Sequence, residues 1–187
     1  MSDPLPIIDD ETGKPVISYF VVSFVPEPLA SELAEMAQAL PDGFEPQSPE
    51  RMHITWRSFD GLPSGLLEPL KDALREICQS TEPFEAQISG GGEFDLGAVW
   101  AGLSPSEELM ALQRRIDGAL SVLGLPQATH DFVPHITIGH GPPGSQAPPM
   151  LEPLNQTFAI EEVLLTTTGN QAYRVVVRTS LGEESEE

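Results

Sequence analysis

The tripeptide His-Ile-Thr occurs twice in this chain, at residues 53–55 and 135–137. Each copy closes the same series of segments: a strand-like run, a helix-like run, and then the strand that carries the tripeptide. The first series begins with the apolar run 16–25 and the second with the run 94–103. One series that recurs in one order indicates an internal repeat, so the fold has to bring two similar halves together.

Hydrophobic spacing predicts an α+β chain. Apolar residues recur at helical spacing in three segments, and the runs between them are β-branched or alternate in polarity. We expect strands over 16–25, 51–59, 84–90, 94–103, 132–140, 157–167 and 172–179, and helices that begin near residues 29, 69 and 104. The glycines at 90–92 are expected to form a turn, and Ser104 with Glu107 is expected to cap the third helix.

Side chains alternate between the two faces of a strand, which orients both motifs. His53, Thr55 and Arg57 are expected on one face of their strand, and His135 and Thr137 on one face of theirs. If a pseudo-two-fold axis relates the halves, the two polar faces meet in one cleft. We therefore expect two pseudo-symmetric lobes of antiparallel sheet, each backed by helices, with a catalytic cleft between them.

Two imidazoles and two hydroxyls are suited to displacement at phosphorus without a metal ion or another cofactor. A neutral imidazole takes a proton from the attacking water, and a protonated one gives a proton to the departing ribose oxygen. Thr55 and Thr137 are expected to donate hydrogen bonds to the phosphate oxygens, and Arg57 to add a cation. The predicted reaction is the opening of a cyclic phosphate.

The segments HITW at 53–56 and PHITI at 134–138 resemble the paired His-x-Thr-x motifs of the two-histidine (2H) phosphoesterase superfamily. The similarity is to the RNA 2′,3′-cyclic phosphodiesterases of the LigT/ThpR type, also called 2′-5′ RNA ligases, and it covers roughly residues 16 to 180. The resemblance implies hydrolysis of cyclic phosphate ends to 2′-phosphates and, in some members, reversible 2′-5′ joining. It also implies that His53 is the proton donor and His135 the acceptor.

Charge restricts the substrate. The chain has 29 acidic and nine basic side chains, a formal net charge of −20 at pH 7. Such a field repels polyanions, so we expect no binding to long duplex nucleic acid. The expected substrate is an RNA 3′ end or a small cyclic nucleotide.

The two ends of the chain are predicted to differ from its middle in structural order. Residues 1–15 are expected to be a flexible arm, 16–180 a single bilobal domain, and 181–187 an acidic disordered tail. No segment resembles a signal peptide or a membrane-spanning helix, so we expect a cytoplasmic monomer with no membrane partner.

Several polar residues near the motifs are expected to lie outside the site. Arg51 is interpreted as a surface charge and His130 as a solvated loop residue. His140 lies five positions after His135 and is therefore expected on the opposite face of the strand, and Trp56 is expected in the core.

Three other interpretations are open. A non-catalytic RNA- or nucleotide-binding module would keep the fold, but would need exposed aromatic residues and a basic groove. A metal site from His130, His135 and His140 has regular spacing, but one extended strand cannot bring these side chains together. A histidine-triad nucleotide hydrolase needs several histidines alternating on one strand, and neither motif strand has them.

Overall fold

The computed structural model describes residues 16–94, 97–142, 156–168 and 173–182. In these residues one antiparallel sheet runs in the order β7-β4-β5-β6-β3-β1-β8-β9, with β2 paired to β6. The strands are β1 (Ser18–Phe24), β2 (Glu45–Pro46), β3 (His53–Asp60), β4 (Phe84–Glu93), β5 (Ala98–Leu103), β6 (His135–His140), β7 (Thr157–Ile160), β8 (Glu162–Thr168) and β9 (Tyr173–Ser180). The helices are α1 (Leu29–Ala37), α2 (Leu67–Gln79) and α3 (Glu107–Val122), with a short 3₁₀ turn, η1, at Pro49–Arg51.

The order of the sheet is symmetric about its centre. The motif strands β3 and β6 are neighbours, β1 flanks β3, and β5 flanks β6. The unit β1-α1-β3 in the first half therefore corresponds to β5-α3-β6 in the second. This arrangement confirms the α+β class and the two similar lobes predicted from the sequence.

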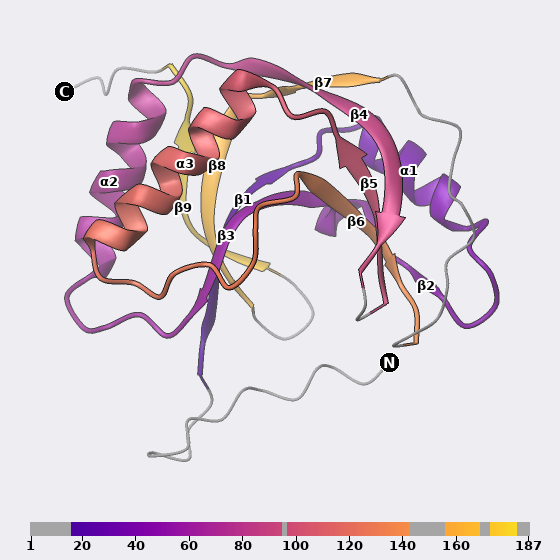
Figure 1. The fold of residues 1–187 in the computed structure, drawn as a ribbon, viewed down its shortest axis with the longest axis horizontal. Coiled ribbons are helices and arrows are strands. Elements are labelled where there is room, and N and C mark those ends of the chain that lie inside the picture. Colours follow the sequence, from indigo (N-terminus) through magenta and orange to yellow (C-terminus); the bar gives the residue numbers. More distant parts are fainter. Residues whose placement is uncertain (1–15, 95–96, 143–155, 169–172, 183–187) are drawn as a thin grey trace.

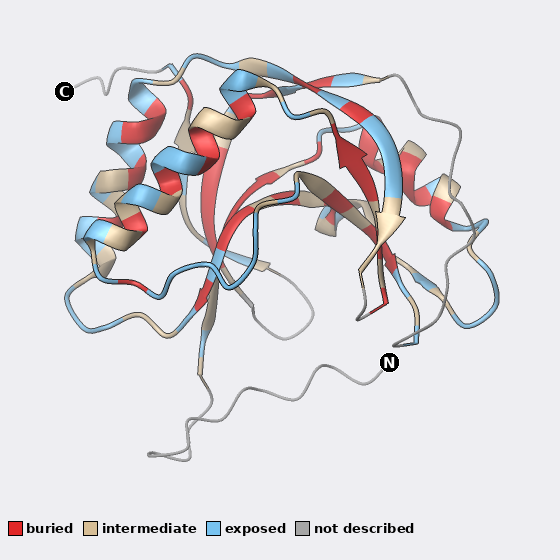
Figure 2. Ribbon diagram, viewed as in Figure 1, coloured by how far each residue is buried: buried red, intermediate tan, exposed pale blue. Residues whose placement is uncertain are grey.

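The helices lie on the outer side of the sheet and interlock the lobes. Helices α2 and α3 lie side by side over one lobe, and α1 covers the other (Figure 1). Helix α3 contacts β3 and α1 contacts β6, so the helix of each half packs on the motif strand of the other. The sides of the helices that face the sheet are buried (Figure 2), as the apolar spacing predicts.

A β-bulge follows each His-Ile-Thr. The register of β3 against β1 passes from Thr55 to Arg57 and skips Trp56. The register of β6 against β5 skips Ile138 in the same way. A bulge interrupts the alternation of side chains between faces, so the residues after each motif are turned relative to a regular strand.

The first bulge changes the place of Arg57. We predicted this side chain on the face of His53, but it is only 5% exposed and lies on the helix side of the sheet. Its Nε is 2.8 Å from the carboxylate of Asp117 on α3, and its guanidinium donates to the carbonyl of Pro126. The prediction for Arg57 was wrong because the strand is not regular at Trp56, where the bulge turns the following side chain to the other face.

Two predicted boundaries around β4 and α3 are corrected. Strand β4 continues through the three glycines to Glu93, because Gly90 takes a left-handed conformation (φ 68°) that makes an irregularity in the strand and not a turn. Helix α3 is capped by Ser106, whose Oγ accepts from the backbone N–H of Leu109 at 3.1 Å. Ser104 is not the cap because its backbone N–H still donates to Gln87 of the sheet, at 2.8 Å.

The C-terminal part also differs from the prediction. The single strand expected over 157–167 is two strands, because β7 pairs with β4 of one lobe and β8 with β1 of the other. Leu181, assigned to the tail, is buried, and the backbone N–H of Gly182 donates to Cys78. The rest of the predicted tail, residues 183–187, and the predicted arm 1–15 lie outside the described residues.

Every helix in the described ranges is too short or too polar to cross a membrane.

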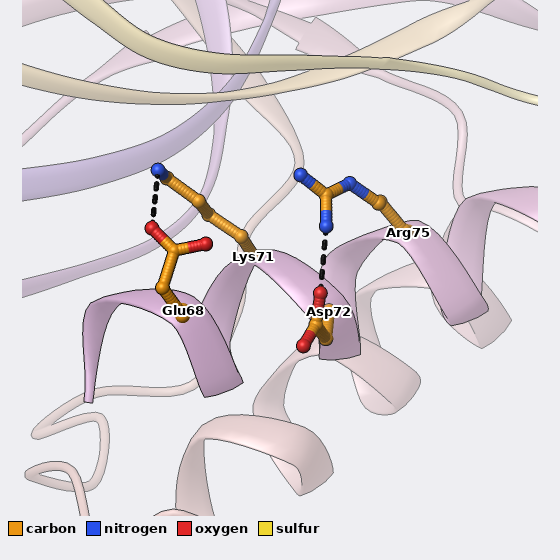
Figure 3. Close-up of polar contacts among 4 residues, drawn as sticks. All are labelled: Glu68, Lys71, Asp72 and Arg75. Atoms are coloured by element: carbon orange, nitrogen blue, oxygen red, sulfur yellow. Dashed lines mark hydrogen bonds and ion pairs between the residues drawn. The ribbon is translucent and has the colours of Figure 1, made fainter. Parts of the chain in front are cut away.

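The Arg57–Asp117 pair gives a test of how the helix layer is attached. Asp117→Asn leaves a buried guanidinium without its counter-charge, so we expect a loss of about 1–3 kcal/mol in the free energy of unfolding, measured by urea denaturation. The control is Asp72→Asn, which removes an exposed partner of Arg75 within α2 (Figure 3) and should cost less than about 0.5 kcal/mol. Equal losses in the two variants would contradict a stabilising role for the Arg57–Asp117 pair.

Candidate active site

The two motifs meet at the centre of the sheet. Strands β3 and β6 are antiparallel, and the ladder between them pairs Ile54 with Ile136. Continuing this register sets His53 opposite Thr137 and Thr55 opposite His135. The two histidines are then diagonal neighbours, at a separation of about 7–8 Å between strand positions. We call this group of four residues the histidine face.

Both histidines are held in the same way by the backbone. The ring Nδ1 of His53 lies 2.6 Å from the carbonyl oxygen of Arg51, and Nδ1 of His135 lies 2.6 Å from that of Val133. A carbonyl oxygen only accepts, so Nδ1 carries the proton in each ring. The neutral form of each imidazole therefore has an unprotonated Nε2, which is the nitrogen left to react.

Aromatic rings flank each histidine. Tyr173 meets the ring of His53 edge to face, with centroids 4.9 Å apart, and Phe24 lies 5.8 Å from it. Phe94 meets the ring of His135 with centroids also 4.9 Å apart. These contacts fix the ring planes and remove water from part of each imidazole.

Trp100 completes the surroundings of His135, with ring centroids 6.0 Å apart. It pairs with Gly92 across β4 and β5, and a Cβ at Gly92 would lie 2.5 Å from the indole ring. Glycine is therefore required for the indole to lie against β4. The indole Nε1 is buried without a hydrogen-bond partner in the described part of the chain.

Burial makes protonation of both histidines unfavourable. Desolvation is the largest effect on His53, and the nearby charges of His135 and Arg51 add to it. Together they lower the pKa of His53 to about 4, although the hydrogen bond to the Arg51 carbonyl acts in the opposite direction. Desolvation also lowers the pKa of His135, against the effect of its bond to Val133.

The remaining predicted site residues have different positions. Thr55 and Thr137 are half-buried on the histidine face. Arg57 is not brought to this face. His130 is exposed in a loop.

His140 differs from the prediction because of the second bulge. Ile138 and Gly139 are both buried, and His140 after them is exposed. The bulge shifts the alternation of side chains between the two faces of β6 by one residue. His140 therefore lies on the same face of the sheet as His135. Desolvation lowers its pKa first, followed by the charge of Arg51.

Arg51, interpreted from the sequence as a surface charge, lies beside the histidine face. It is half-buried, and its Cζ lies 5.7 Å from the centroid of the Tyr173 ring. Arg51, His53 and Thr55 are spaced by two residues, with the fully buried Met52 and Ile54 between them. The period-two spacing was a signal that could have placed Arg51 beside His53.

No group of three or more His, Cys, Asp or Glu side chains within the described ranges is arranged to hold a metal ion. A cavity of about 490 Å³ lies where the ends of β1, β7 and β9 meet. Phe24 lines this cavity and also packs on His53, but neither histidine lines it. The chemistry that the residues support is therefore that of the histidine face.

A family model described as the 2′-5′ RNA ligase superfamily matches residues 22–171. The chain belongs to the 2′-5′ RNA ligase superfamily. This finding confirms the resemblance that the paired His-Ile-Thr motifs indicated.

Two RNA 2′,3′-cyclic phosphodiesterases are similar in sequence. That of Methanothermobacter thermautotrophicus is 33% identical over 95 residues, which are 49% of this chain and 51% of that protein. That of Geobacillus stearothermophilus is 28% identical over 128 residues, or 64% of this chain and 41% of that protein. The chain thus spans about half the length of these relatives.

Solved structures show the same fold. A protein of Thermus thermophilus superposes with a TM-score of 0.78 at 22% identity, over 90% of this chain and all of that one (100%). Escherichia coli LigT in its apo form gives 0.77 at 19% identity, over 90% and 99% of the two chains. LigT complexed with 3′-AMP gives 0.74 at 20% identity, over the same shares.

The lowered pKa of His53 predicts a pH dependence. Histidine NMR should give a midpoint near pH 4 for His53, well below the usual value of 6.5. Between these two values the unfolded chain takes up a proton that the folded chain does not, so the free energy of unfolding should fall as pH is lowered from 6.5 to 4. His53→Asn has no titrating ring and should show a shallower fall. An NMR midpoint near 6.5 would refute the desolvation of His53.

Proposed function

We propose that the chain hydrolyses a 2′,3′-cyclic phosphate, on an RNA end or a small nucleotide, to a 2′-phosphate without a metal ion. The observation that carries this proposal is the central register, which sets two histidines and two threonines on one face with both Nε2 atoms available. The activity named for the two sequence relatives supports the reaction, and the 3′-AMP complex of LigT supports a nucleotide as ligand.

The reaction moves one proton at each histidine. Nε2 of neutral His135 takes a proton from water as its oxygen attacks phosphorus. The bond from phosphorus to the ribose 3′-oxygen breaks, and Nε2–H of protonated His53 gives its proton to that oxygen. The hydroxyls of Thr55 and Thr137 donate to the non-bridging oxygens, where negative charge builds in the transition state. Attack by an RNA 5′-hydroxyl in place of water would form a 2′-5′ bond.

His53 can act as the proton donor only when its imidazole is protonated. In the free protein its pKa of about 4 keeps it neutral near pH 7. A bound phosphate brings negative charge to the histidine face, which favours the imidazolium and raises this pKa. The substrate therefore helps to create the protonation state that the reaction uses.

The net charge favours small substrates. At −20 the chain repels a long polyanion, whereas one phosphate is attracted or repelled mainly by its nearest groups. A free cyclic nucleotide or a short RNA end fits this field better than a long RNA.

We also propose that the protein acts in the cytoplasm and as a monomer.

A nucleotide-binding module without catalysis is the second candidate function. The observation in its favour is the set of aromatic rings beside the two histidines, since such rings can stack on nucleobases. It differs from the first candidate in one measurable respect, because a module binds cyclic nucleotides without converting them.

Turnover in excess EDTA tests the reaction class. We expect hydrolysis of adenosine 2′,3′-cyclic monophosphate, and of a short RNA ending in a cyclic phosphate, because no step passes through a metal ion. Chromatography should identify the 2′-phosphate as product. Binding of the cyclic nucleotide without conversion would instead support the module, and formation of the 3′-phosphate would contradict the direction of proton transfer.

Single histidine variants separate the two roles. His53→Ala and His135→Ala should each reduce kcat by about 10²–10⁴-fold, because each removes one proton transfer. A p-nitrophenyl ester of a nucleoside phosphate has a leaving group that needs no proton. His53→Ala should therefore recover much of its rate on this ester, and His135→Ala should not.

The control for both variants is His130→Ala, which changes an exposed loop histidine and should keep the wild-type rate. Recovery in His135→Ala in place of His53→Ala would reverse the assigned roles. Near-normal rates in both variants on the cyclic nucleotide would exclude the mechanism.

A further inference from the structure

The position of Arg51 is set by the same backbone that orients His53. Arg51 ends η1, and its carbonyl accepts the hydrogen bond from Nδ1 of His53 at 2.6 Å. Met52, which follows, is extended and fully buried. The Arg51 side chain therefore leaves the backbone on the same side as His53.

The guanidinium of Arg51 lies among the groups of the histidine face. Its Cζ is 5.7 Å from the centroid of Tyr173, whose ring in turn is 4.9 Å from that of His53. Its positive charge acts on His53 at the start of β3 and on His140 at the end of β6. The cation thus reaches residues of both motif strands.

Most other basic side chains have acidic or polar partners. Lys71, Arg75, Arg57 and Arg178 form ion pairs, and Arg115 donates to Ser80 and Thr81. Arg51 forms no ion pair with any described carboxylate, and its Nε is buried without a hydrogen-bond partner there. In a chain of net charge −20, this half-buried cation has no described carboxylate in ion-pair contact. Its guanidinium forms a hydrogen bond with the side chain of Tyr173 and interacts at longer range with the charge of the neighbouring Glu50.

This arrangement has a cost in free energy. A desolvated guanidinium N–H without an acceptor costs free energy, and the charge opposes protonation of the nearby histidines. An anion with several acceptor oxygens would remove both penalties. A phosphate matches the planar N–H groups of a guanidinium.

We propose that Arg51 is a substrate-binding residue, whose guanidinium donates to the non-bridging oxygens of a phosphate on the histidine face while the Tyr173 ring holds it in place. This inference rests on the proposed function for the identity of the substrate, but concerns the binding of a phosphate, which is measured without turnover. The sequence predicted that Arg57 binds the phosphate. This inference assigns that role to Arg51.

The test compares Arg51→Gln and Arg51→Lys with the control Arg114→Gln. Arg114 is exposed on α3, so its variant makes the same change in net charge away from the histidine face. The probes are inorganic phosphate and 2′-AMP, with Kd from isothermal titration calorimetry, and kcat/KM on adenosine 2′,3′-cyclic monophosphate. Thermal unfolding checks that the variants stay folded.

We expect Arg51→Gln to weaken the binding of both probes about 10- to 100-fold and to lower kcat/KM about 10²- to 10³-fold. Arg51→Lys keeps the charge but not the planar donors, so it should lie between Arg51→Gln and the wild type. Arg114→Gln should match the wild type in all measurements.

The outcomes distinguish this inference from the proposed function. If the wild type hydrolyses the cyclic nucleotide and Arg51→Gln binds both probes as tightly as the wild type does, the role of Arg51 is overturned and the proposed hydrolysis is not. Probe binding that depends on Arg51, in a wild type without turnover, supports Arg51 and overturns the hydrolase. Absence of probe binding in the folded wild type, or equal weakening in Arg114→Gln, also overturns the assignment.

Discussion

The pairing of Ile54 with Ile136 is the contact on which the rest of the site depends. Each isoleucine is the middle residue of its motif. Antiparallel pairing at this point therefore sets the first residue of each tripeptide opposite the last residue of the other. A shift of one residue would turn one histidine to the helix side of the sheet. Burial of both isoleucines against the core opposes that shift, because it would expose them to water. Core packing and the geometry of the reacting groups are therefore fixed by one register.

The aromatic rings and backbone carbonyls that contact the two histidines determine the electrostatics of the histidine face. Aromatic rings take the imidazoles partly out of water, and backbone carbonyls hold their Nδ1 atoms, so the neutral rings present Nε2. The same desolvation lowers the pKa of each ring. The histidine face thus disfavours protonated imidazoles and, at Arg51, has a cation with no described carboxylate in ion-pair contact. Both features favour a site that reaches its working charge state only with an anion bound.

The sequence predicts the central part of this structure well and its edges less well. The repeat, the fold class and the family could be recognised from the doubled motif, because it occurs twice at the end of the same series of segments. The place of Arg57 could not be predicted, since a bulge depends on how two strands pair and leaves little trace in one of them. His140 was misplaced for the same reason. Arg51 was interpreted as a surface charge although the predicted strand 51–59 contains it and its spacing of two residues from His53 sets both side chains on one face.

The packing of α1 on β6 and of α3 on β3 has a consequence for how such a chain could arise. Neither half is a complete unit: each lends its helix to the other half's motif strand, and each histidine has the other half's threonine opposite it. An ancestor consisting of one half would have needed a second copy of itself, related by a two-fold axis through the isoleucine pair. Gene duplication and fusion would then have freed the halves to diverge. Trp100 pairs with Thr137 at the position where Val22 pairs with Thr55 in the other half, so the two halves surround their histidines differently, and the two rings can take different tasks.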